Sequence, residues 1–167
     1  MLCEVPRFAV DAMLGKMAKW LRFMGFDTLY VYVRYPHEVR RLVSEGRVFV
    51  TRNRRWQGMK GVIVISANDL DDQIVELAEV LDFALPDDDE WFSRCGRCNA
   101  VLEQVDRRSV TGMVPEYVWE TTEEFFRCPT CGKVYWPGSH VERMQGKLES
   151  LKRALAEKGG RDYGGSF

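Results

Sequence analysis

Two C-x-x-C pairs constrain the fold of this chain more than any other feature: Cys95 with Cys98, and Cys128 with Cys131. Each pair offers two thiolates from one short hairpin, and two such hairpins supply the four tetrahedral sulfur ligands that structural zinc prefers. Redox pairs or unliganded buried cysteines fit poorly, because the pairs are alike and their context is not thioredoxin-like. We therefore predict one structural zinc ion. Its closed coordination shell leaves no position for a water nucleophile.

The remaining composition is that of a globular protein. The 167 residues, 46% of them apolar, are enough for one ordinary core plus a small module. The cysteine count of five is odd, so a secreted disulfide framework fits poorly and Cys3 is left as a free thiol. No run approaches the roughly 20 apolar residues of a membrane span, and the start lacks a signal-peptide pattern. We expect a cytoplasmic protein.

Charge is distributed unevenly along the chain, although the formal net charge is only -1. Residues 1–60 carry 12 Lys and Arg against 5 Asp and Glu, whereas residues 61–93 carry 10 Asp and Glu and no Lys or Arg. This asymmetry is compatible with a basic surface for polyanions beside an acidic cluster for metal ions. The alternative is that the acidic residues only form a solvent-exposed surface and bind no metal ion.

Strand-like and helix-like patterns alternate in the first half of the chain. Apolar, β-branched or aromatic runs predict strands over residues 7–10, 28–33, 47–51 and 62–66. Apolar residues at helical spacing predict helices over 13–24 and 37–45, and a third helix after residue 69. Repeated strand–helix alternation favours an α/β fold with a mainly parallel sheet and flanking helices.

A charged breaker at residues 86–90 is the best candidate for a domain boundary. We expect a first domain over 1–90, a zinc ribbon with an inserted loop or helix over 91–140, a C-terminal helix over 141–158 and a disordered tail over 159–167. The last helix carries an apolar stripe formed by Val141, Met144, Leu148, Leu151 and Leu155. This stripe packs either on the main domain or against a second copy of the chain, so a homodimer or a protein partner is one alternative.

A candidate site lies where the predicted strands end. Asp11 follows the first strand, and ligands of open α/β sheets bind at the carboxyl ends of strands; the alternative is a helix N-cap. Polar runs over 51–54 and 66–69 follow two later strands and should converge on Asp11. Carboxylates at such an edge hold magnesium or manganese. That arrangement suits phosphodiester hydrolysis by metal-activated water.

Basic residues flank this predicted edge. The RNA-binding candidates are Lys16, Lys19 and Arg22 on the polar side of the first helix, and Arg52, Arg54 and Arg55 after the third strand. Such side chains contact phosphates, and the neighbouring Trp56 can stack on a base. The alternative for the helix is that its basic residues only make the surface soluble.

Several blocks of residues together resemble the Mut-seven C-terminal ribonuclease domain family. They are residues 8–22 (FAVDAMLGKMAKWLR), 25–28 (GFDT), 46–52 (GRVFVTR), 94–99 (RCGRCN) and 128–140 (CPTCGKVYWPGSH). The blocks occur in order over residues 7–145. The resemblance implies a PIN-like nuclease fold fused to a zinc ribbon, and metal-dependent cleavage of RNA.

The resemblance also assigns candidate catalytic residues. Asp11 matches the first acidic position of the family, Glu38 is the best match for the second, and Asp69 or Asp72 supplies a further carboxylate. The family has an aspartate where this chain has Asn53, and an amide brings no negative charge and cannot accept a proton as a carboxylate does.

The sequence thus predicts an endoribonuclease that uses magnesium or manganese and is weakened by Asn53. The alternatives are a non-catalytic RNA-binding module, a chain whose active-site acid was replaced artificially, and a scaffold that docks a protein partner.

Overall fold

The computed structural model describes residues 5–83 and 85–159. The predicted free thiol at Cys3 and residues 160–167 of the predicted tail (159–167) lie outside the described residues, whereas Gly159 ends the last helix. Within the described ranges, no helix is both long enough and apolar enough to cross a membrane.

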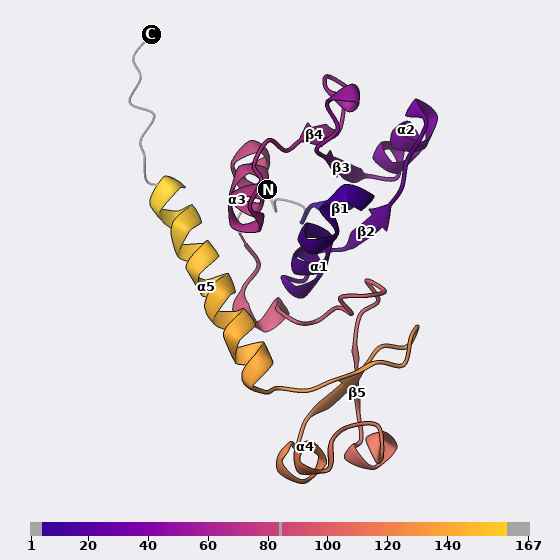
Figure 1. The fold of residues 1–167 in the computed structure, drawn as a ribbon, viewed down its shortest axis with the longest axis vertical. Coiled ribbons are helices and arrows are strands. Elements are labelled where there is room, and N and C mark those ends of the chain that lie inside the picture. Colours follow the sequence, from indigo (N-terminus) through magenta and orange to yellow (C-terminus); the bar gives the residue numbers. More distant parts are fainter. Residues whose placement is uncertain (1–4, 84, 160–167) are drawn as a thin grey trace.

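A four-stranded sheet forms the centre of the N-terminal part (Figure 1). Its strands are β1 (Arg7–Asp11), β2 (Thr28–Val31), β3 (Arg47–Thr51) and β4 (Val62–Val64), in the order β2-β1-β3-β4. Every pairing is parallel. Both faces of β1 are buried, and this is why its sequence is a continuous apolar run without alternation. The structure confirms the predicted mainly parallel α/β fold.

Helices cover both faces of this sheet. They are α1 (Gly15–Phe23), α2 (Pro36–Ser44) and α3 (Leu70–Leu81). Phe8 and Val10 of β1 belong to the core shared with α1 and α3, whereas Ala9 between them belongs to the core shared with α2. The period of two along the strand thus sends alternate side chains to opposite layers.

A second, antiparallel sheet lies in the cysteine-containing region, residues 94–136, called the ribbon below. Its strands are β5 (Glu103–Val105), β6 (Phe125–Arg127) and β7 (Val134–Tyr135). The insertion between the cysteine pairs contains the short helix α4 (Glu116–Thr121). The buried core of the ribbon has only four apolar side chains, Val110, Val118, Phe125 and Val134.

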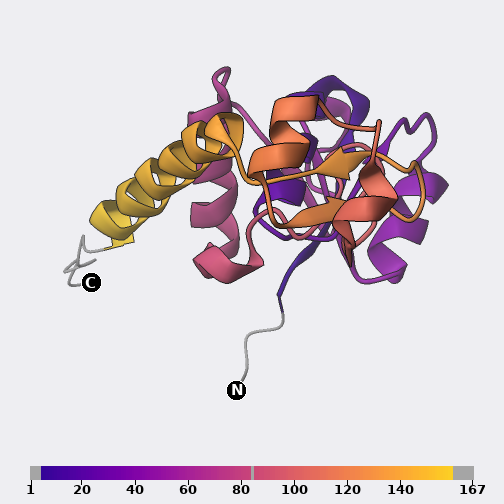
Figure 2. The ribbon, with the colours of Figure 1, turned by 90° about the horizontal axis from the view of Figure 1, so that it is seen from below.

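The last helix, α5 (Ser139–Gly159), runs beside α3 in both Figure 1 and Figure 2. Leu148 and Leu151 of its apolar stripe are buried in the main core with α1 and α3. An ion pair of 2.9 Å joins Lys147 to Asp71 of α3. The stripe is therefore buried against the same chain. This apolar surface is not available for pairing with a second copy of the chain.

Candidate functional site

The four cysteines of the two C-x-x-C pairs come together at one point. Their sulfur atoms all lie within 4.8 Å of one another. The two turns are alike: the N–H of Cys98 points to the sulfur of Cys95 at 3.4 Å, and the N–H of Cys131 points to that of Cys128 at 3.5 Å. The structure confirms that these residues are positioned to bind a metal ion.

Groups around these sulfur atoms favour the thiolate form at Cys95. Burial raises the pKa of the Cys95 thiol, but hydrogen bonds from the Tyr135 hydroxyl and from backbone N–H groups outweigh it and lower the pKa to about 6. The Tyr135 oxygen lies 3.1 Å from the Cys95 sulfur. A thiolate is the form that binds metal, and a hydrogen bond from outside the ligand set helps to orient it.

Arg22 ties the ribbon to the sheet, and this corrects the expectation that it lies on the polar face of its helix. The side chain is only 7% exposed. Its Nε donates to the carbonyl of Thr28 at 2.9 Å, and its Nη1 donates to the carbonyls of Gly96 and Arg97 at 2.9 and 3.0 Å. Burial lowers the pKa of the Arg22 guanidinium, against the opposing effect of the Cys95 and Cys98 sulfurs. Arg22 is therefore unavailable to RNA.

Asn99 adds a second link between the same two parts. It adopts a left-handed backbone conformation (φ 66°) directly after Cys98. Its Oδ1 accepts from the N–H of Thr28 at 2.9 Å, and its Nδ2 donates to Asp27 at 2.8 Å. Burial raises the pKa of Asp27, but hydrogen bonds from Arg47 and Asn99 outweigh it, so the net shift is downward. Sequence reasoning missed this role of Asn99.

Replacement of Arg22 by methionine is expected to lower the free energy of unfolding by about 3 kcal/mol. The loss would arise because the buried carbonyls of Thr28 and Gly96 lose their charged donor. Denaturant unfolding monitored by circular dichroism measures the change. Arg40→Met on the exposed side of α2 is the matched control. Equal stability of the two variants would contradict the role of Arg22.

Asp11 ends β1 at the carboxyl edge of the sheet, and its side chain is only 8% exposed. Its Oδ2 accepts a 2.6 Å hydrogen bond from the hydroxyl of Thr51, which ends the neighbouring strand β3. The same hydroxyl oxygen accepts from the backbone N–H of Asn53 at 3.0 Å. Asp11 occupies the N-cap position of the short 3-10 turn that follows, but its side chain makes no capping hydrogen bond to that turn. Parallel pairing thus brings Asp11 and Asn53 together around Thr51.

Glu38 has a different local role. It lies in the first turn of α2, where its Oε2 accepts the N–H groups of Arg34 and Tyr35, both at 2.8 Å. These backbone hydrogen bonds lower the pKa of the Glu38 carboxyl. They form a capping box that stabilises the start of the helix.

The acidic residues near α3 are spread along its start. Asp69 precedes the helix and Asp72 lies in its first turn; both are exposed, and Asp69 makes no side-chain capping hydrogen bond. Glu76, which sequence reasoning missed, instead reaches the end of β4. It accepts from the N–H and hydroxyl of Ser66 at 3.0 and 2.9 Å and from the N–H of Ala67 at 2.9 Å. Burial raises the pKa of the Glu76 carboxyl, but these hydrogen bonds outweigh the effect of burial, so the net shift of the pKa is downward.

The acidic candidates do not gather into one cluster. Over residues 5–83 and 85–159, the four cysteines are the only group of three or more His, Cys, Asp or Glu side chains close enough to share a metal ion. The edge of the sheet near Asp11 therefore presents one buried carboxylate, and the backbone N–H of Asn53 bonds to the same Thr51 hydroxyl that holds it.

The other basic candidates remain at the surface. Lys16, Lys19, Arg52, Arg54 and Arg55 are all exposed. Arg52 donates to the Asn68 side chain at 2.6 Å, which links the loops after β3 and β4. Arg55 lies over the Trp56 ring at 4.5 Å and donates to the carbonyl of Arg34. Arg52, Arg54 and Arg55 thus place positive charge just after β3, whereas Trp56 is buried, so the expectation that it stacks on a base is wrong.

A family model described as the Mut7-C RNAse domain matches residues 6–148, which include both the parallel sheet and the ribbon. Searches of curated proteins and of solved structures found no match.

Proposed function

The chain belongs to the Mut7-C RNAse domain family, and on that basis we propose that it is a metal-dependent endoribonuclease whose activity is weakened by Asn53. The observation that carries the proposal is the buried carboxylate of Asp11, held by Thr51 beside Asn53 at the carboxyl edge of a parallel sheet. Ligands of open α/β sheets bind at this edge.

The donor set at this edge fits a hard cation. Magnesium is commonly bound by one or two carboxylates and completed by water and substrate phosphate. Asp11 supplies the carboxylate, and the exposed side chain of Asn53 supplies an amide oxygen. When bound, magnesium or manganese activates water for attack and neutralises charge on the phosphate. Asp69 follows Asn68 at the same edge and is the next candidate carboxylate, ahead of Asp72 and the capping residue Glu38.

The chain's own residues then have distinct tasks. The Thr51 hydroxyl donates to Asp11 and fixes the orientation of its carboxylate. Arg52, Arg54 and Arg55 bind the phosphates of the RNA, and Lys16 extends this contact along α1. The four-cysteine site holds structural zinc, because four sulfur ligands leave no open coordination position.

Replacement of Asn53 by aspartate tests this proposal. A second carboxylate beside Asp11 is expected to raise the rate of cleavage of single-stranded RNA with magnesium or manganese about tenfold or more, because it adds a charged metal ligand. Aspartate also retains the capping oxygen that accepts from the Arg55 N–H. The assay compares the rates of both proteins under equal metal.

Gln57→Glu is the matched control, since it adds the same charge at an exposed position just after the turn that follows Asn53. An equal rise in both variants would mean that added negative charge, rather than a metal ligand at position 53, caused it. If neither the wild type nor Asn53→Asp cleaved RNA, the proposal of ribonuclease activity would be abandoned. The chain would then be a non-catalytic RNA-binding module, a function that the presence of Asn53 also favours.

A further inference from the structure

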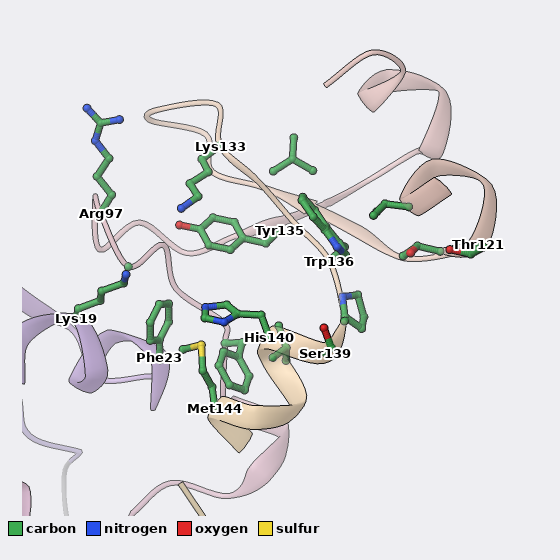
Figure 3. A pocket seen from close by; sticks show the side chains of 18 of the residues that line it. Lys19, Phe23, Arg97, Thr121, Lys133, Tyr135, Trp136, Ser139, His140 and Met144 are labelled. Atoms are coloured by element: carbon green, nitrogen blue, oxygen red, sulfur yellow. The ribbon is translucent and has the colours of Figure 1, made fainter. Parts of the chain in front are cut away.

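A pocket of about 600 Å³ lies away from Asp11, between the C-terminal part of α1, the ribbon and the start of α5 (Figure 3). Its size is in the range of ligand-binding sites. The Arg22 hydrogen bonds to Gly96 and Arg97 hold two of its walls together. The pocket is therefore built from both parts of the chain.

Only one sign of charge lines this pocket. Lys19, Arg97 and Lys133 are basic, and none of the described residues that line it is an aspartate or a glutamate. Within the described part of the chain, none of these three cations forms an ion pair with a carboxylate. In Figure 3 the side chains of Lys19 and Lys133 extend toward the Tyr135 end of the pocket. Unpaired positive charge in a hollow attracts an anion.

Aromatic faces line the same space. Tyr135 and Trp136 come from the end of the ribbon, and Tyr117 of α4 is 69% exposed. The indole N–H groups of Trp91 and Trp119 donate to backbone carbonyls, both at 3.1 Å. The indole N–H of Trp136 has no such acceptor among the described residues and remains able to donate to a ligand. Aromatic rings together with cationic side chains are typical of sites that bind single-stranded nucleic acid.

From this composition we infer that the pocket binds one unpaired nucleotide of single-stranded RNA. Its base stacks on the aromatic side chains, and its phosphate contacts Lys19 and Lys133. The inference rests on the proposed function for RNA as the substrate. It adds a binding site distinct from the edge of the sheet at Asp11.

The first helix connects the two sites. Lys16 lies three residues before Lys19, so their side chains are neighbours on the exposed surface of α1. Asp11 precedes the same helix. An RNA strand held in the pocket can therefore follow Lys19 and Lys16 toward Asp11. The bound nucleotide would lie on the same strand as the cleaved bond, and a duplex would not enter, because the stacked base must be unpaired.

Binding of a fluorescein-labelled oligouridylate tests the inference, measured by anisotropy without added magnesium or manganese so that no cleavage is needed. Lys133→Glu and Tyr117→Ala are each expected to weaken binding about tenfold, through loss of a phosphate contact and of stacking area. Both side chains are exposed, so folding should be retained. Binding of double-stranded RNA should be unchanged in both variants.

Arg108→Glu is the matched control, because it reverses a charge on the exposed surface of the ribbon outside the pocket. The inference is overturned if the pocket variants bind oligouridylate like the wild type, as they would if the pocket took a protein segment. It is also overturned if Arg108→Glu weakens binding as much as Lys133→Glu. Absence of cleavage would count against the proposed enzyme and would leave this result standing.

Discussion

Removal of the metal from the four-cysteine site is expected to unfold the ribbon while the parallel sheet remains folded. Apart from its cysteines, the buried core of the ribbon has only four apolar side chains, which is too small a core to fold without a metal. Binding of structural zinc contributes on the order of 10 kcal/mol to folding in comparable small modules. The parallel sheet has a larger core of its own, which includes Phe8, Met17 and Ile74.

Hydrogen exchange read by mass spectrometry measures this effect. In Cys128→Ser, amide protection should be lost across residues 94–136 and kept in β1 and β3. Thr130→Ala changes the same turn without removing a sulfur ligand, and it should retain one zinc ion per chain and full protection. If the amides of a zinc-free ribbon stayed protected from exchange, packing against the sheet would be enough to keep the ribbon folded without metal.

Replacement of Asp11 by asparagine is expected to lower kcat/KM for RNA cleavage about a hundredfold or more, since metal stabilisation of the transition state is worth several kcal/mol. The fold should be retained, because the asparagine oxygen can still accept the hydrogen bond from Thr51. Initial rates at saturating magnesium, together with thermal unfolding, separate loss of activity from loss of stability.

Asp82→Asn is the control for this prediction. It removes the same charge from an exposed position at the other end of α3, in a left-handed conformation that asparagine tolerates. Its kcat/KM should equal that of the wild type. Undiminished cleavage by Asp11→Asn would show that the chemistry takes place elsewhere on the molecule.

Several features of the molecule followed from short-range patterns alone. The buried strands β1 and β3 were predicted because continuous apolar runs are typical of parallel strands covered on both faces. The role of the four cysteines as metal ligands was predicted because the local geometry of each C-x-x-C turn places two sulfur atoms where they can bind one ion. Alternation of strands and helices then placed Asp11 at the carboxyl edge of the sheet.

Glu76 shows why the candidate site was less predictable. Its carboxylate binds the end of β4 from ten residues away, and no single helix or strand pattern reveals such a contact. The family resemblance assigned Glu38 to the same acidic set, yet its oxygen accepts hydrogen bonds from the backbone at the start of α2. The chemistry of a side chain can be read from the sequence, but its partner cannot.

By itself the sequence determined the strands and helices of the parallel sheet, the last helix, the sulfur ligands and the family resemblance, because these depend on residues close together in the chain. Only the tertiary structure decided what Arg22 does: it reaches Gly96 across 74 positions. The same packing placed Lys19 and Lys133 around one pocket. Both outcomes depend on how the ribbon docks on the sheet, and docking is set by buried hydrogen bonds between distant residues rather than by local periodicity.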